Sequence, residues 1–185
     1  MPRITRALLL YRYRRLREAR SAAREAGFKG AMFPWQSGSN GREESQQIHL
    51  NPMSGRWIAD VSWRQRHIGA AICYNIWQYY EATGDADFLT NYGAELFFEI
   101  ARFWSSLARR RKDGRYQISG VMGPDEFHTA YPTPNPSAPG GISNNAYTNV
   151  MVAWLMARAF DVLDCIPSAK RQRLCERLGL KDEEF

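Results

Sequence analysis

Apolar residues recur at steps of three and four positions along much of the chain, which is the period of an α-helix. This pattern predicts five helices, over residues 4–26, 67–82, 86–110, 145–163 and 168–178. Gly27 and Gly84 are placed to end the first two helices, and Asp85 is placed to cap the third. A short strand is expected over residues 115–119. The pattern therefore predicts an all-α fold.

The predicted helices fall into two kinds. Those at 67–82 and 145–163 are apolar on almost every side and follow long irregular segments, whereas those at 86–110 and 168–178 are amphipathic and follow short turns. A helix that is apolar on every side is normally buried. We therefore expect inner helices that alternate with outer ones, as in a helical hairpin array or an α/α toroid. The long loops would gather at one end, where we expect the functional site.

The long polar segment at residues 28–66 is rich in glycine and contains Pro34 and Pro52. Its composition predicts no element of the core. Loops of this length in a compact domain are usually either functional or disordered. Trp35, Trp57 and Trp63 favour an ordered loop.

The chain has 185 residues, of which 44% are hydrophobic and 13% aromatic, and this composition is typical of one globular domain. No apolar run reaches the roughly 18 to 20 residues of a membrane span, and the first residues lack the apolar core of a secretory signal. The three cysteines and three histidines have no metal-ligand spacing, so neither a metal nor a cofactor is expected. Free thiols favour the reducing cytoplasm.

The net charge of +6 is concentrated near the N-terminus, where residues 1–30 hold nine Arg or Lys and two Glu. A basic helix of this kind can bind nucleic acid, an acidic membrane or an acidic protein. It can equally be a solvated face, or one covered by a partner. Because no nucleic-acid motif accompanies the charge, we expect neither nucleic acid nor a membrane as the partner.

The segment SGVMGPDEFHTA, residues 119–130, places the carboxylates of Asp125 and Glu126 side by side, with His128 two residues further on. In an extended loop, neighbouring side chains point in opposite directions, so Glu126 and His128 would share a face and Asp125 would not. One carboxylate that stays protonated near neutral pH can act as the general acid at a glycosidic oxygen. The alternative is that both carboxylates cap the backbone or pair with arginines.

Four further residues are candidates for binding a sugar. Trp35 and Gln36, in GAMFPWQSGSNG, offer an aromatic face beside an amide group, although buried packing of the tryptophan is the alternative. His67 precedes an apolar helix and lies at its loop end, where it could bind substrate, cap the helix or pack. Asn145, in NNAYTN, is placed to cap the fourth helix.

Five segments together carry a family resemblance: GAMFPWQS, QRHIGAAICYNIWQYYEATGDADFL, YGAELFFEIARFWSS, GVMGPDEFH and NNAYTNVMVAW. In this order they resemble the central catalytic domain of glycoside hydrolase family 65, which includes the maltose, trehalose and kojibiose phosphorylases. The resemblance implies a partial (α/α)6 barrel. It also implies an inverting attack on an α-linked glucose disaccharide, by inorganic phosphate in the phosphorylases and by water in hydrolytic relatives.

The resemblance also suggests residue roles. The residue that matches the family's general acid is Glu126, while Trp35 and Gln36 match a segment that lines the glucose subsite. His67 and Asn145 lie in motifs at the barrel mouth. Many relatives carry an acid where this chain has Gln36, and the Pro-rich loop at residues 129–141 is longer than in relatives.

Fewer than half of the twelve helices of a complete barrel are predicted here, and residues 1–185 are expected to form a single incomplete barrel domain. The family's N-terminal β-sandwich and the C-terminal part of the barrel are expected to be absent. The chain should then carry only the acid half of the site and be inactive alone, unless a complementary chain or another copy covers its exposed seams. The alternative is a non-catalytic interaction module that uses its basic N-terminal helix.

Overall fold

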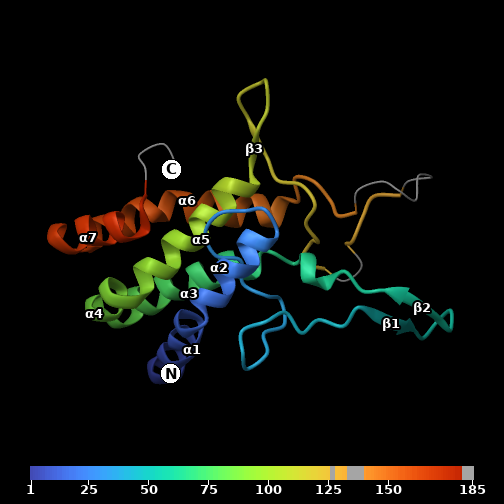
Figure 1. Ribbon diagram of the computed structural model, residues 1–185, viewed down its shortest axis with the longest axis horizontal. Coiled ribbons are helices and arrows are strands. Elements are labelled where there is room, and N and C mark those ends of the chain that lie inside the picture. Colours follow the sequence, from blue (N-terminus) through green and yellow to red (C-terminus); the bar gives the residue numbers. More distant parts are fainter. Residues whose placement is uncertain (126–127, 133–139, 181–185) are drawn as a thin grey trace.

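The computed structural model describes residues 1–125, 128–132 and 140–180. The described part is mostly helical, as the sequence pattern predicted. Figure 1 shows the helices gathered in one half of the molecule, with the long loops and a hairpin extending from the other half. The longer helices are α1 (Pro2–Arg14), α2 (Leu16–Glu25), α3 (Ile68–Thr83), α5 (Ala94–Leu107), α6 (Ala146–Cys165) and α7 (Ser168–Leu178). None of the helices in these ranges combines the length and apolar character that a membrane span needs.

The single helix predicted at residues 4–26 is divided into α1 and α2 at Arg15, whose φ of −103° and ψ of 11° interrupt the helix. The aliphatic part of the Arg15 side chain packs against Gly41, and its guanidinium lies 5.8 Å from the centre of the Tyr11 ring. These partners come from a distant loop and from the preceding turn. The prediction of one helix is therefore wrong at Arg15, because the periodicity of a helix contains no signal from a distant loop.

The predicted roles of Gly27, Gly84 and Asp85 at helix ends are confirmed. At the end of α2, Gly27 has a φ of +82°, and the N–H of Phe28 donates to the carbonyl of Ala23 at 2.8 Å. This reverse turn satisfies a carbonyl that the helix end would leave unpaired. Gly84 ends α3 with a φ of 63°, and the Asp85 carboxylate accepts a bond from the N–H of Phe88 at 2.9 Å.

The predicted helix at 86–110 consists of α4 (Ala86–Phe88), a π-helical turn (Leu89–Gly93) and α5. It ends earlier than predicted, because the next residues form β3 (Arg109–Arg110), which pairs antiparallel with β4 (Tyr116–Gln117). The strand predicted at residues 115–119 is thus present but shorter.

The polar segment at residues 28–66 differs from its prediction in two ways. It contains an antiparallel hairpin of β1 (Ile48–Asn51) and β2 (Arg56–Ala59), which leaves Trp57 exposed. It also contributes Ala31 and Phe33 to the core, although no core element was predicted here. Both side chains are buried by contacts with helices that lie far away in the sequence.

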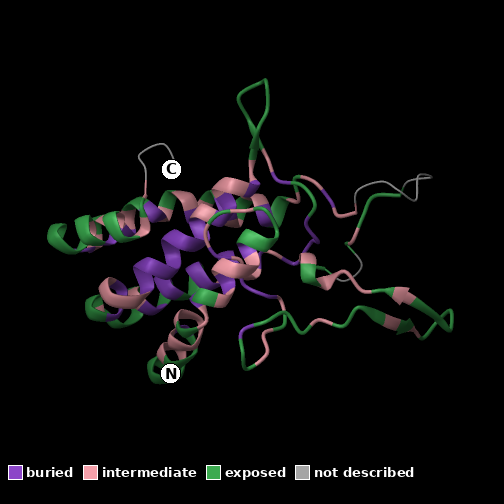
Figure 2. Ribbon diagram, in the orientation of Figure 1, coloured by how far each residue is buried: buried purple, intermediate pink, exposed green. Residues whose placement is uncertain are grey.

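Two helices differ from what the apolar pattern indicated, since α5 was expected to be an outer helix and is buried, whereas α6 was expected to be buried and is partly exposed. Every residue of α5 from Ala94 to Ala101 is buried, and α5 contacts α2, α3 and α6. Figure 2 shows this buried centre on α3 and α5. Helix α6 instead buries one stripe and exposes an apolar face on the opposite side. That exposed face consists of Val150, Ala153, Ala157 and Phe160.

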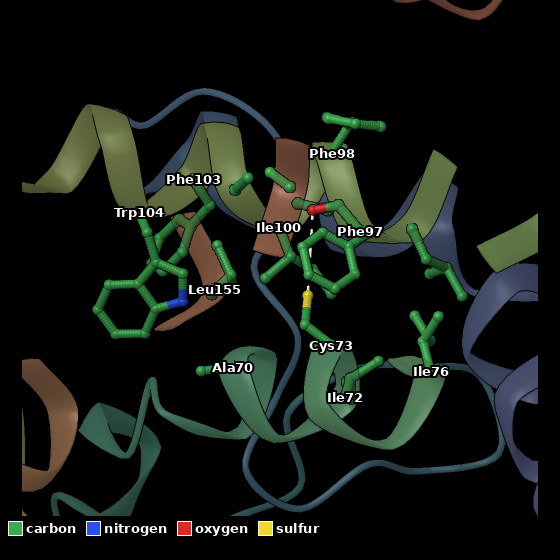
Figure 3. Close-up of a cluster of buried hydrophobic side chains, with 14 of the residues drawn as sticks. Ala70, Ile72, Cys73, Ile76, Phe97, Phe98, Ile100, Phe103, Trp104 and Leu155 are labelled. Atoms are coloured by element: carbon green, nitrogen blue, oxygen red, sulfur yellow. Dashed lines mark hydrogen bonds between the residues drawn. The ribbon is translucent and has the colours of Figure 1, made fainter. Parts of the chain in front are cut away.

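The core between α3 and α5 is tightly packed. Figure 3 shows Phe97, Ile100 and Trp104 of α5 facing the side chains of α3. The Cys73 thiol, which is fully buried, lies 4.0 Å from the carbonyl oxygen of Phe97. Burying each large side chain of this kind stabilises the fold by roughly 1.5 to 3 kcal/mol, so this layer fixes the position of α3 and the residues before it.

Gly30 lies where the chain crosses the backbone of α5. Its φ is +69°, and a Cβ at this position would stand 2.1 Å from the carbonyl oxygen of Glu99. Gly30→Ala should therefore lower the unfolding free energy by more than about 3 kcal/mol. The strain of a positive φ at alanine and the clash of its Cβ with the backbone of α5 both contribute to this loss. Urea unfolding followed by circular dichroism would measure it.

Gly27→Ala is the matched control, because Gly27 also has a positive φ but nothing lies within 4 Å of the added Cβ. It should cost only about 1 to 2 kcal/mol. Equal losses of unfolding free energy in the two variants would show that the close approach of Gly30 to α5 does not add to the cost of the substitution.

Candidate active site

Three aromatic rings from distant parts of the sequence meet at the loop end of the helices. The centres of the Trp35 and His67 rings are 5.4 Å apart, and those of His67 and Tyr147 are also 5.4 Å apart, edge to face. Trp35 comes from the loop after α2, His67 directly precedes α3, and Tyr147 lies in the first turn of α6. The sequence reasoning named Trp35 and His67 but not Tyr147, although Tyr147 belongs to the NNAYTN motif.

His67 is 6% exposed and does not cap α3 with its side chain. Its ring forms a hydrogen bond with the backbone of Met122, and its Nδ1 has no partner in the described part of the chain. Burial lowers the pKa of His67, and the bond to Met122 opposes this shift only in part. The ring is therefore neutral at neutral pH, with one nitrogen available as a hydrogen-bond acceptor.

Met122 lies at the start of the loop that contains the paired carboxylates. Its N–H donates to the carbonyl of Arg64 at 3.0 Å, and the neighbouring Val121 forms a β-bridge with Ile142. These bonds tie the loop both to the chain before His67 and to the segment that leads into α6. The start of the carboxylate loop is thus held beside the aromatic rings.

The carboxylate loop turns back on itself. The N–H of His128 donates to the carbonyl of Asp125 at 3.4 Å, and the N–H of Gly123 donates to the carbonyl of His128 at 3.1 Å. The described residues here form turns and not an extended strand, and the expectation that Glu126 and His128 share a face stays a prediction. The Asp125 carboxylate is exposed and lies 3.7 Å from the His128 ring. Among the described residues, no arginine forms an ion pair with it. Glu126 lies outside the described residues.

Asn145 caps α6, as its position in the sequence indicated. Its Oδ1 accepts hydrogen bonds from the N–H of Thr148 at 3.0 Å and from the Thr148 hydroxyl at 3.2 Å. Its Nδ2 lies close to Gly123, where an added Cβ would approach to 3.2 Å. Asn145 therefore connects the start of α6 with the carboxylate loop, and the small size of Gly123 permits that approach.

The backbone of Trp35 and Gln36 is held by one carboxylate. Glu43 accepts a bond from the N–H of Trp35 at 2.7 Å and one from the N–H of Gln36 at 3.1 Å. Gln36 itself is exposed. Sequence reasoning missed Glu43, because a carboxylate that binds backbone N–H groups leaves no distinctive spacing.

Several N-terminal arginines contact the protein itself. The guanidinium of Arg6 lies 3.2 Å from the Asp85 carboxylate, that of Arg12 lies 5.9 Å from the centre of the Phe33 ring, and Arg20 pairs with two acids of α5. Part of the basic charge is therefore used within the fold, and no specific observation favours the interaction module. Among the described residues, no three side chains of the metal-binding types lie together.

The whole chain, residues 1–185, matches the family model of the glycosyl hydrolase family 65 central catalytic domain. The chain therefore belongs to this family. It is 56% identical over 185 residues to an uncharacterized glycosyl hydrolase of Mycobacterium tuberculosis, covering 100% of this chain and 14% of that protein. It is 51% identical over 153 residues to trehalose 6-phosphate phosphorylase of Lactococcus lactis, covering 83% of this chain and 19% of that protein.

A solved structure is similar as well. The putative kojibiose phosphorylase from the human microbiome superposes with a TM-score of 0.76 and 26% identity, covering 97% of this chain and 21% of that chain. This chain therefore spans only a minor part of the length of its relatives. The fold of the solved structure agrees with the helices and loops described above.

Proposed function

We propose that this chain carries the acid side of an inverting phosphorylase site for an α-linked glucose disaccharide, with Glu126 as the general acid and inorganic phosphate as co-substrate. The observation that carries the proposal is the meeting of Trp35, His67 and Tyr147 beside Met122, four residues before Glu126. Membership of family 65, and relatives named as phosphorylases, support the reaction class.

In the proposed reaction, Glu126 donates its proton to the glycosidic oxygen as the bond from that oxygen to C1 of glucose breaks. A phosphate oxygen attacks C1 from the opposite face, which gives β-glucose 1-phosphate and a free sugar, and solvent returns a proton to the Glu126 carboxylate. Phosphate is already a nucleophile, so this reaction needs no second carboxylate as base. Trp35 would stack on an apolar sugar face, and the neutral His67, Gln36 and Asn145 would assist by binding hydroxyls or by holding the loops.

We also propose that residues 1–185 form part of an (α/α)6 barrel, completed by helices outside this sequence. The exposed apolar face of α6, with Val150 at 67% and Phe160 at 58% exposed, supports a missing neighbour on that side. The missing helices, a complementary chain or a second copy would cover it, and the residues that bind the attacking phosphate at the reaction centre would lie on those parts. The three free cysteines fit a cytoplasmic enzyme.

A graft into a complete relative tests the proposal. The isolated chain should form no glucose 1-phosphate from trehalose 6-phosphate, trehalose or kojibiose, because it holds only one side of the site. Replacing the aligned segment of the Lactococcus lactis enzyme by this chain's matching 153 residues should keep phosphorolysis within about tenfold of the parent.

In the same graft, Trp35→Ala should raise KM more than it lowers kcat, because stacking binds the ground state and the transition state alike. A folded graft without phosphorolysis would contradict the proposed function. Glucose 1-phosphate formed by the chain alone, and lost on Glu126→Gln, would contradict the proposal that the site is incomplete.

A further inference from the structure

A cleft of about 1100 Å³ lies between α2 and the loop that follows it. Trp35, His67 and Tyr147 do not line it, so it is distinct from the aromatic site. Its lining includes five arginines and three glutamates, and Arg20 among them pairs with Glu95 and Glu99 of α5: Arg17, Arg20, Arg24, Arg42, Arg66, Glu18, Glu25 and Glu43. Arginines outnumber glutamates in this lining, which favours an anionic ligand.

Arg66 is the most constrained of these cations. Its guanidinium lies 5.0 Å from the centre of the Trp63 ring, and its Nη1 contacts the sulfur of Met32 at 2.6 Å, a weak acceptor. Burial lowers the pKa of Arg66 to about 10, against an opposing effect of Glu43. Arg66 thus stays charged at neutral pH, while among the described residues no carboxylate oxygen lies within 4 Å of it.

The glutamates of the cleft are already engaged. Glu43 holds the N–H groups of Trp35 and Gln36, Glu25 accepts from the Ser21 hydroxyl at 2.9 Å, and Glu18 lies 3.9 Å from Arg15. Because these glutamates bind other groups, some arginines of the cleft are left without an ion pair. Within the described ranges, Arg17, Arg42 and Arg66 form no ion pair with any of these acids.

We propose that this cleft binds a phosphate group, either as inorganic phosphate or as the ester group of a sugar phosphate. Every basic residue of the lining is an arginine, and the planar guanidinium forms paired hydrogen bonds with phosphate oxygens. A phosphate monoester carries a charge of about −1.5 to −2 at pH 7, which the unpaired Arg17, Arg42 and Arg66 would balance.

The cleft also borders the aromatic site. Pro34 and Arg66 line the cleft, and they are the chain neighbours of Trp35 and His67. Consecutive Cα atoms are about 3.8 Å apart, so a phosphate group bound here would lie against the backbone that carries both rings. The site goes beyond the proposed function and does not depend on Glu126.

Phosphorus NMR titration of the 185-residue chain at constant low ionic strength tests the proposal. Inorganic phosphate and trehalose 6-phosphate are the two probes, and at least one should bind with a Kd of about 1 mM or tighter. Similar affinities would support recognition of the phosphate group alone, and tighter binding of the ester would support a sugar phosphate. Absence of binding of both probes at about 10 mM would overturn the proposal.

Arg66→Gln and Arg42→Gln should each weaken binding at least about tenfold, because each removes charged hydrogen bonds to the phosphate. Arg42 is exposed, so its replacement leaves folding intact even where that of Arg66 does not. Arg110→Gln, on β3 and outside the cleft, is the control for lost charge and should change the Kd less than twofold. Equal losses in all three variants, or no loss in either cleft variant, would overturn the proposal.

Discussion

Glu126→Gln is expected to lower phosphorolysis by the completed enzyme by a factor of about 10² to 10⁴, the range typical of lost general-acid catalysis. Glutamine keeps the size and shape of the side chain but has no proton to give to the leaving oxygen. The measurement is kcat for glucose 1-phosphate formation from the disaccharide by the grafted enzyme. A fall of less than tenfold would contradict the assignment of Glu126.

The leaving group provides the control for this prediction. A glucosyl fluoride needs little protonation, so Glu126→Gln should slow its turnover much less than that of the disaccharide. Asp125→Asn should slow both substrates alike and only modestly, because the exposed Asp125 carboxylate faces His128 and shapes the loop. A loss confined to the disaccharide in Asp125→Asn, with none in Glu126→Gln, would reverse the two roles.

Glu99→Gln is expected to cost about 3 kcal/mol of unfolding free energy, the lower end of the range for breaking a buried ion pair. The Glu99 carboxylate is 4% exposed and lies 2.7 Å from Arg20 and 3.2 Å from Arg102. Removing its charge takes a buried carboxylate away from two guanidinium groups, although Arg20 keeps its pair with Glu95 and Arg102 keeps its bond to the carbonyl of Leu178. Because Arg20 is about one third exposed, water relieves part of the cost, and the lower end of the range applies.

Urea unfolding at 25 °C measures this loss as a lower midpoint at an unchanged m-value. Glu81→Gln is the matched control, since Glu81 is exposed on α3 and bonds only to Gln78 among the described residues. It should change the unfolding free energy by less than about 0.5 kcal/mol. If Glu99→Gln cost no more than Glu81→Gln, the pairs to Arg20 and Arg102 would contribute nothing to stability.

Helix ends and caps were predictable from the sequence because their signals are local. Gly27, Gly84, Asp85 and Asn145 each act through bonds to residues within a few positions. The break at Arg15 and the burial of α5 were not predictable, because both depend on partners distant in the sequence. The apolar pattern of α6 predicted that this helix is buried on every side, but one of its apolar faces is exposed.

The candidate site was predictable in part. Trp35 and His67 were found because their residue types and their loop positions suit sugar binding, and the structure brings them together. Tyr147 was missed because an aromatic residue in a helical first turn resembles core packing. The contact of Glu43 with backbone N–H groups depends on how the loop folds, and no residue pattern predicts it.

The π-helical turn at Leu89–Gly93 limits insertions and deletions in this part of the chain. Such a turn holds one residue more than an α-helical turn would, and each residue of an α-helix rotates the chain by about 100°. Before the turn, Phe88 packs edge to face on Tyr79, while after it Glu95 and Glu99 face Arg20. Deleting one residue would restore a regular helix but would separate either Phe88 from Tyr79 or the two acids from Arg20. The length of this segment is therefore fixed by contacts on both of its sides, and a single-residue deletion here would be far more harmful than one in an exposed loop.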